Sequence, residues 1–368
     1  MRDKTILFSI CSLGLGHATR TLPIIQNYLK KNKILILSDG NALLFLKDKL
    51  KKCNVNFFEK KKHYPLLELA SNRYEYYFNL TKDSLKMKLA LKSEQKQVKK
   101  ICETEKVDFI ISDGNYGSHH KEIPSFLITH QIDFQVKGKL YKTIGNLYNS
   151  RTYKKFSHLL ILDYPSKNKS LSGNLAHCAK ILKRSPHTFV GILSQYKKIK
   201  IPETIDYLII ISGFLHRHRE EFYNNLLHAL KGKKGKKVFI MGDYKKNYSK
   251  KIGKDIQIFS SFKNLDQNKL LNQSKVIISR AGYSTLMDMV ELEKNALLIP
   301  TPYQSEQEYL AEYHKNKKLF NIILNQKNIE IKKIIDYKKN FKKLEKTKAS
   351  LKKIDKVIKQ YLPQKDDN

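Results

Sequence analysis

Short apolar runs alternate with longer segments of helical periodicity throughout this 368-residue chain. Parallel strands joined by crossover helices produce such an alternation, because strands buried on both faces read as continuous apolar runs. The expected strands form two series, which are 6–10, 33–37, 109–112, 125–129 and 159–162, followed by 207–212, 237–241, 257–259, 275–279 and 296–299. The sequence therefore predicts an α/β protein with two doubly wound, Rossmann-like domains.

The two series are separated by a lysine-rich stretch that ends near Pro202. A chain of this length usually exceeds what one hydrophobic core organises, so two domains are the natural expectation. We predict a first domain at 1–190, a hinge at 191–205, a second domain at 206–330, and a basic C-terminal helix and tail at 331–368.

The charge of the chain is strongly unbalanced, since 71 Lys and Arg face 34 Asp and Glu for a formal net charge of +37. Such a field attracts phosphate-bearing substrates, anionic lipid or nucleic acid. Compositional drift on solvated faces would give the same charge without a partner. No recognised nucleic-acid-binding module occurs, so we expect no specific nucleic acid.

The four cysteines are scattered and form no Cys-x-x-Cys pair. This spacing argues against a disulfide framework or a thiolate zinc site and favours a reducing compartment. No apolar run reaches the roughly 18 residues that a membrane span requires. We therefore expect a cytoplasmic protein.

A glycine-rich turn at 12–20 directly follows the first expected strand. Gly14 and Gly16 allow close approach of a ligand to the backbone, and His17 stands where a general base is needed. Ligands of open parallel sheets bind at the carboxyl ends of the strands, where this turn lies. A tight turn with a hydrogen-bonded histidine is the alternative interpretation.

Pro23 sets the expected start of the following helix, because proline is best tolerated in a first helical turn. We therefore expect the regular helix to begin near Thr21 and to leave His17 and Arg20 on the preceding loop.

A second unusual turn occupies 279–285, between an expected strand and a helix. Gly282 gives clearance, Ser284 and Thr285 add hydroxyls, and a helix N-terminus favours phosphate. Asp288 and Glu291 follow on the same helix and can accept hydrogen bonds from ribose hydroxyls. The alternative is that Ser284 only caps the helix.

A third turn, at 300–309, follows the next expected strand and carries two prolines with a cluster of Gln and Glu. Amide and carboxylate side chains can bind sugar hydroxyls. Because it comes one β-α unit after the second turn, we expect a sugar site beside a phosphate site.

A metal site is not expected from this sequence. Tandem His119 and His120, and the histidines within 216–219, do not place two imidazoles on one helical face, and no Asp-x-Asp motif occurs. We therefore expect no metal and no cofactor.

Taken together, the turns at 14–20, 279–285 and 300–309 resemble those of family 28-type GT-B glycosyltransferases. These enzymes are related to the lipid-linked N-acetylglucosaminyltransferase of peptidoglycan synthesis and to galactolipid synthases. The resemblance covers nearly the whole chain in order. It implies two Rossmann-like domains facing across a cleft, the first binding the acceptor and the second the nucleotide sugar.

The resemblance also assigns residues. It places the catalytic histidine on His17, the diphosphate turn on 282–285 and the ribose-binding acid on Asp288, where the family more often has Glu. The donor-binding set is Ser212, Gly213, Arg280, Gly282, Tyr283, Ser284, Thr285, Asp288, Gln304, Glu306, Gln307 and Glu308. The acceptor or loop set is Gly14, Gly16, Arg20, Asp113 and His130.

Two positions depart from the family pattern. Gln307 and Glu308 stand where the family has a Gln pair that reads the sugar, so the sugar stays unidentified. Residues 214–219 replace the polar, proline-rich turn that is expected after Ser212 and Gly213. The residues that bind part of the donor phosphate or base are therefore not assigned.

The resemblance implies an inverting, metal-independent transfer of a hexose or N-acetylhexosamine from a nucleotide diphosphate sugar, expected to be UDP-linked. The expected acceptor is a saccharide or lipid-linked hydroxyl of a cell envelope glycan, reached peripherally at the inner membrane face. Residues 66–77 and 86–100 are the expected face toward an anionic membrane surface. A nucleotide-sugar epimerase of the same architecture is the main alternative, followed by a nucleic-acid-binding protein.

Overall fold

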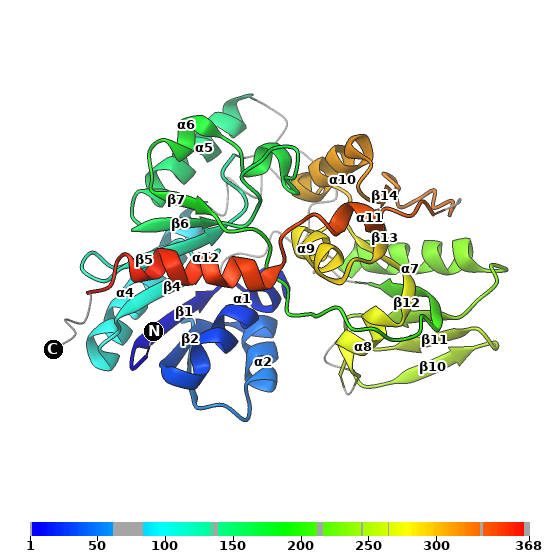
Figure 1. Ribbon diagram of the computed structural model, residues 1–368, viewed down its shortest axis with the longest axis horizontal. Coiled ribbons are helices and arrows are strands. Elements are labelled where there is room, and N and C mark those ends of the chain that lie inside the picture. Colours follow the sequence, from blue (N-terminus) through cyan, green and yellow to red (C-terminus); the bar gives the residue numbers. More distant parts are fainter. Residues whose placement is uncertain are drawn as a thin grey trace. The chain divides into compact units, whose positions relative to one another are not determined.

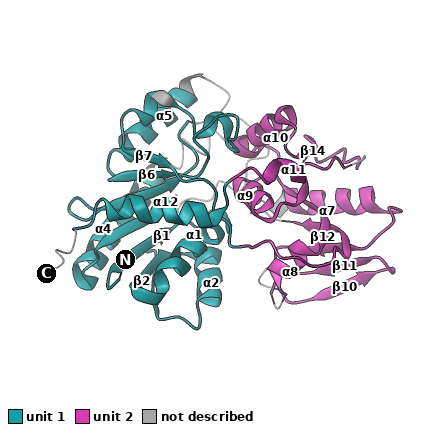
Figure 2. Ribbon diagram, viewed as in Figure 1, with its two compact units in different colours: residues 1–195, 345–368 teal, residues 196–344 magenta. Residues whose placement is uncertain are grey.

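The computed structural model describes residues 2–61, 84–133, 135, 139–211, 216–243, 246–263, 265–331 and 334–363. The chain divides into two compact units, unit 1 with residues 1–195 and 345–368 and unit 2 with residues 196–344 (Figure 2). The boundary lies between Gln195 and Tyr196, within the segment expected as a hinge. The C-terminal segment is shared, because residues up to Leu344 belong to unit 2 and the rest return to unit 1.

Unit 1 contains one fully parallel sheet with the strand order β3-β2-β1-β4-β5-β6-β7 (Figure 1). Its strands are β1 (Thr5–Ile10), β2 (Lys33–Ser38), β3 (Val55–Glu59), β4 (Phe109–Asp113), β5 (Ser125–Thr129), β6 (His158–Ile161) and β7 (His187–Phe189). The five expected strands are confirmed. Only the edge strands β3 and β7 were missed, because their residues are partly exposed and give no continuous apolar run.

Unit 2 contains a second sheet with the order β10-β11-β9-β8-β12-β13-β14, parallel except for the β10–β11 pair. Its strands are β8 (Ile205–Ile210), β9 (Lys237–Ile240), β10 (Ser249–Ile252), β11 (Ile256–Phe259), β12 (Ser274–Arg280), β13 (Asn295–Ile299) and β14 (Asn321–Ile322). All five expected strands are again present. The added edge strands β10 and β14 are short and polar.

Helices connect the strands in both units. Those of unit 1 are α1 (Gly16–Tyr28), α2 (Gly40–Lys49), α4 (Ser84–Glu105), α5 (Lys139–Tyr153), α6 (Ala179–Leu182) and α12 (Thr347–Lys359), with 3₁₀ turns η1 (Leu29–Lys31) and η2 (Gly173–Leu175). Those of unit 2 are α7 (His216–Leu230), α8 (Gln267–Asn272), α9 (Tyr283–Leu292), α10 (Ser305–Lys317) and α11 (Lys338–Phe341). Two doubly wound α/β domains are therefore confirmed.

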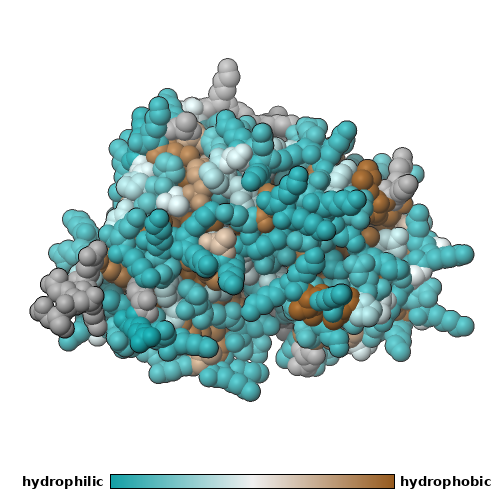
Figure 3. Space-filling view, viewed as in Figure 1, coloured by the Kyte–Doolittle hydropathy of each residue, from teal (hydrophilic) through white to brown (hydrophobic). Residues whose placement is uncertain are grey.

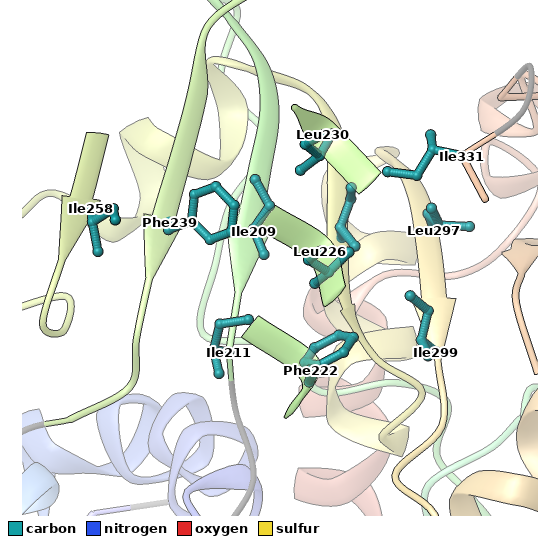
Figure 4. Close-up of a cluster of buried hydrophobic side chains, with 11 residues drawn as sticks. Ile209, Ile211, Phe222, Leu226, Leu230, Phe239, Ile258, Leu297, Ile299 and Ile331 are labelled. Atoms are coloured by element: carbon teal, nitrogen blue, oxygen red, sulfur yellow. The ribbon is translucent and has the colours of Figure 1, made fainter. Parts of the chain in front are cut away.

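Each sheet buries its apolar residues against its helices. In unit 2, Phe222, Leu226 and Leu230 of α7 face the apolar side chains of β8, β9 and β13 (Figure 4). In unit 1, α4 packs Val98 and its neighbours on the sheet. These cores hold the strand ends, and so the turns that follow them, in fixed positions.

The helix α12 belongs to unit 1 although it ends the chain. The hydroxyl of Tyr361, just beyond this helix, donates to Ser157 O at 3.1 Å and lies 3.0 Å from His158 Nδ1. Ile354, Val357 and Ile358 are buried. The expected basic C-terminal helix is thus a packed element of the first unit, and the tip at 364–368 lies outside the described residues.

The face of the molecule in Figure 3 is mainly hydrophilic, with small separate apolar patches. Within the described ranges, no helix has the length and apolar character needed to cross a membrane.

Candidate functional site

The strand order of unit 1 sets β1 and β4 side by side at the point where the sheet is extended in opposite directions. Ile10, at the end of β1, pairs with Asp113, at the end of β4. Crevices at such switch points are the usual ligand sites of open α/β sheets. The turn with His17 and the carboxylate of Asp113 therefore meet at this edge.

The helix α1 begins at Gly16, so the expectation that it begins near Thr21 was wrong. Pro23 lies inside the helix, although proline there removes one hydrogen bond and costs about 3 kcal/mol. The earlier start places His17 and Arg20 three residues apart on a helix, where side chains share one face. On that face both side chains contact the buried Asp113.

Asp113 is the centre of a cluster of hydrogen bonds and is fully buried. Its Oδ1 lies 2.8 Å from His17 Nδ1, and its Oδ2 accepts from Arg20 Nε at 2.8 Å and from Thr21 Oγ1 at 2.7 Å. Arg20 Nη2 also donates to Oδ1, so the guanidinium holds both carboxylate oxygens. The cluster joins α1 to the end of β4.

The tautomer of His17 decides which of these partners it bonds. Nδ1 lies between an acceptor, Asp113 Oδ1, and a donor, Arg20 Nη2 at 2.9 Å. In the tautomer with the proton on Nδ1, that proton is donated to Asp113 and Nε2 keeps its lone pair. That tautomer orients His17 as a base, with a side chain that is 22% exposed.

The charges of the cluster shift both pKa values. Burial and then the positive charge of Arg20 lower the pKa of His17, and Asp113 opposes this. Burial alone would raise the pKa of Asp113, but the charges and hydrogen bonds of Arg20 and His17 outweigh it and hold that pKa far below its usual range. The carboxylate is therefore ionised and the imidazole neutral near pH 7.

Gly114 allows the ring of His17 to lie against the backbone. A Cβ at this position would stand 2.6 Å from His17 Cε1, and the φ of +72° is in the left-handed region. Gly14 also has a positive φ, of +76°, but open space around it. Gly14 therefore serves the bend of the turn, whereas Gly114 serves the close approach.

His130 completes the cluster from the segment that follows β5. Its Nδ1 lies 3.2 Å from Arg20 Nη1, and the residue is 7% exposed. Because arginine only donates, His130 Nδ1 is the acceptor in this contact. The structure thus brings His17 and Arg20, which the sequence placed in one turn, together with Asp113 and His130 from two other segments.

In unit 2 the equivalent switch point lies between β8 and β12. Ser212 and Gly213, which follow β8, lie outside the described residues. On the β12 side, Gly282 is the N-cap of α9, and no side chain caps this helix. The interpretation of Ser284 as the cap is therefore wrong. The first amides of α9 form an N-terminus suited to an anion.

The turn after β13 lies against this helix N-terminus. Gln307 Nε2 would be 3.9 Å from a Cβ on Gly282, while Gln307 Oε1 accepts from Thr301 N at 2.9 Å. Glu308 Oε1 accepts from Tyr303 N at 2.9 Å and so supports a residue with a φ of +64°. The second and third turns are therefore neighbours in space.

Arg280 is used inside unit 2. It is 2% exposed and donates to Pro300 O at 3.0 Å, to His218 O at 2.9 Å and to Gln326 Oε1 at 2.8 Å. Burial lowers its pKa to about 9. These bonds fix the end of β12 relative to the next turn, which makes Arg280 a candidate positioning residue.

The other donor candidates lie on or next to the helices α9 and α10. Tyr283 is buried, whereas Ser284, Thr285 and Asp288 on α9 are half-buried. Gln304 is the N-cap residue of α10, and Glu306 lies in its first turn. Glu291 lies near the C-terminal end of α9 and is also half-buried.

Sequence reasoning did not single out Thr21 or Gly114, although both contact the cluster. A glycine directly after the Asp that follows an expected strand was a usable signal for close backbone approach. Thr21 gave no signal, because its partner is 92 residues away.

In the described part of the chain, no group of three or more His, Cys, Asp or Glu is arranged to hold an ion.

Comparison with known families finds a match in the second half of the chain. The model described as the glycosyltransferase family 28 C-terminal domain matches residues 217–361. No curated protein matches the chain in sequence.

Solved structures match over nearly the whole length. The glycotransferase of kitacinnamycin has a TM-score of 0.63 at 12% identity and covers 99% of this chain and 100% of its own. The glycosyltransferase SnogD from Streptomyces nogalater has a TM-score of 0.59 at 10% identity, with 97% and 100% covered. UDP-GlcNAc 2-epimerase from Neisseria meningitidis has a TM-score of 0.52 at 13% identity, with 96% and 100% covered. At these identities the likeness concerns the fold.

Proposed function

We propose that this chain, a family 28-type glycosyltransferase of the GT-B fold, transfers a hexose or N-acetylhexosamine from a nucleotide diphosphate sugar to an acceptor hydroxyl, with His17 as the base. The observation that carries the proposal is the contact between His17 Nδ1 and Asp113 Oδ1 at 2.8 Å. With the Nδ1 proton donated to Asp113, Nε2 is the proton acceptor in a site at the carboxyl end of the sheet.

The proposed reaction is a single displacement. The acceptor oxygen attacks the anomeric carbon as its proton passes to His17 Nε2, and the bond from that carbon to the diphosphate oxygen breaks. The resulting imidazolium keeps its Nδ1–H bond to Asp113, which stabilises the new charge. The configuration inverts, so an α-linked donor gives a β-glycoside.

The donor is proposed to bind on unit 2 at the N-terminus of α9. Free amides of that helix and the hydroxyls of Ser284 and Thr285 would hold the diphosphate and its growing negative charge. Asp288 would accept hydrogen bonds from ribose, and Gln307 and Glu308 from the sugar. No metal is required in this scheme.

A donor screen tests the proposal directly. Purified protein is incubated with UDP-, dTDP- and GDP-linked sugars and a membrane extract as acceptor source, and nucleotide diphosphate release is measured. We expect release with a UDP-sugar that depends on the extract. Isomerised nucleotide sugar formed from donor alone would instead indicate the epimerase reaction of the alternative.

The acceptor is proposed to be a saccharide or lipid-linked hydroxyl at an anionic membrane surface. The expected docking residues at 66–77 lie outside the described residues. The lysines of α4 are all exposed, and they are Lys86, Lys88, Lys92, Lys96, Lys99 and Lys100. On the same helix Leu89 is 45% exposed, whereas Val98 is buried against the sheet. Each lysine near such a surface contributes about 1 kcal/mol.

Vesicle sedimentation tests this docking. We expect binding to anionic but not neutral vesicles, and loss of binding when Lys88, Lys92, Lys96 and Lys99 are changed to Glu. Changing the exposed Lys231, Lys233, Lys234 and Lys236 of unit 2 to Glu alters the net charge equally and is the matched control. Equal loss in both variants, or no binding by the wild type at low salt, contradicts the docking face.

A further inference from the structure

The guanidinium of Arg20 lies within the cluster around the proposed base. Arg20 is 3% exposed, and its Nε and Nη2 take both oxygens of Asp113. Its Nη1 reaches His130 Nδ1 at 3.2 Å. All three guanidinium nitrogens of Arg20 are thus engaged within the cluster.

The charge balance around His17 depends on this arginine. The groups that face His17 are Asp113 from β4, Arg20 from α1 and His130 after β5, with Cys11 close by across Gly114. Burial raises the pKa of Cys11 to about 11, so it is uncharged near pH 7. The positive charge in direct contact with the carboxylate of Asp113 is that of Arg20.

A histidine beside a buried carboxylate that has no other counter-ion is drawn toward its protonated form, which cannot accept a proton. Arg20 removes that tendency because it supplies the counter-ion. Its planar fork also fixes the rotation of the carboxyl group, and with it the direction of the Nδ1–H bond. Both effects act on His17 through Asp113 or through space.

We propose that Arg20 is a positioning residue that keeps His17 neutral and oriented for proton transfer, an inference that rests on the proposed role of His17 as the base. Removing the positive charge, as in Arg20→Met, then raises the pKa of His17. A base must be neutral to act, so the acid limb of the rate profile moves to higher pH.

The test compares three variants with the wild type by the pH dependence of kcat/KM and by NMR titration of the His17 ring, assigned from the signal that is missing in His17→Ala. Arg20→Met is expected to raise both midpoints by about one unit or more. Arg20→Lys keeps the charge, so its midpoints stay near those of the wild type while kcat falls. Thr21→Val removes an uncharged hydrogen bond to the same carboxylate and is expected to leave both midpoints in place.

Unchanged midpoints in a folded Arg20→Met protein, with only a uniform loss of rate, would overturn the inference. If Arg20→Met does not fold, the wild-type titration decides, because a ring midpoint above the ordinary value of about 6.5 also overturns it. If the ring midpoint moves and the rate profile does not, the effect of Arg20 on His17 stands and the proposed base role of His17 fails.

Discussion

The switch point of unit 1 is filled by ionisable side chains, whereas that of unit 2 presents a helix N-terminus whose cap is a glycine. In unit 1, the carboxylate of Asp113 collects bonds from His17, Arg20 and Thr21. In unit 2, Gly282 caps α9 without a side-chain bond, and the nearby Arg280 is bonded to other parts of the same unit. Two sheets of similar topology therefore carry different chemistry at equivalent positions.

This difference fits the proposed binding of the acceptor by unit 1 and of the donor by unit 2. A preorganised histidine and carboxylate suit proton transfer from an acceptor, and an uncapped helix N-terminus suits a diphosphate. Changes in unit 1 should therefore lower kcat, and changes in unit 2 should mainly weaken donor binding. The following predictions test this separation, from the largest expected effect to the smallest.

Replacing the proposed base should have the largest effect. His17→Ala is expected to lower kcat by roughly 10² to 10⁴, with donor affinity nearly unchanged, because the side chain acts in unit 1 on the acceptor proton. Single-turnover rates and donor titration measure the two quantities. The exposed His228→Ala is the control, and near-normal turnover of His17→Ala would remove His17 from the mechanism.

Crowding the base without removing it should have an intermediate effect. Gly114→Ala is expected to lower kcat by roughly 10 to 10², because its Cβ would stand 2.6 Å from His17 Cε1 at a φ of +72° and displace the ring. Steady-state kinetics with circular dichroism as a folding check measure this. A folded variant with wild-type kcat would show that the ring position is not critical.

The glycine of unit 2 gives the contrasting variant. A Cβ on Gly282 meets no protein atom closer than 3.9 Å, so Gly282→Ala should fold normally. The methyl group would occupy the space above the helix N-terminus, and we expect the donor KM to rise about 10-fold with a smaller change in kcat. A loss in kcat without a change in KM would contradict the division between the two units.

Metal removal should have the smallest effect. Transfer is expected to survive EDTA, since the N-terminus of α9 supplies the positive potential that a cation would otherwise provide. Rates before and after chelation measure this. Complete loss that magnesium or manganese restores would mean that unit 2 needs an ion and that the helix alone does not hold the diphosphate.

The sequence predicted the ten main strands because a strand buried on both faces leaves a continuous apolar run that can be read locally. It also predicted that an unusual turn follows three of those runs, although α1 begins earlier than expected. The edge strands β3, β7, β10 and β14 were not predicted, because they are short and partly exposed or polar and so give no continuous apolar run. The start of α1 was misplaced because Pro23 was given more weight than the tertiary contacts of the first turn.

By itself the sequence determined two α/β domains and the candidate role of His17, because these depend on residues close together in the chain. Only the tertiary structure decided the partners of that histidine, since Arg20 and Asp113 lie 93 positions apart and meet through the pairing of β1 with β4. It likewise decided that Arg280 is bonded within its own unit and that α12 returns to unit 1. Local periodicity specifies elements, whereas burial of charged groups depends on which distant elements pack together.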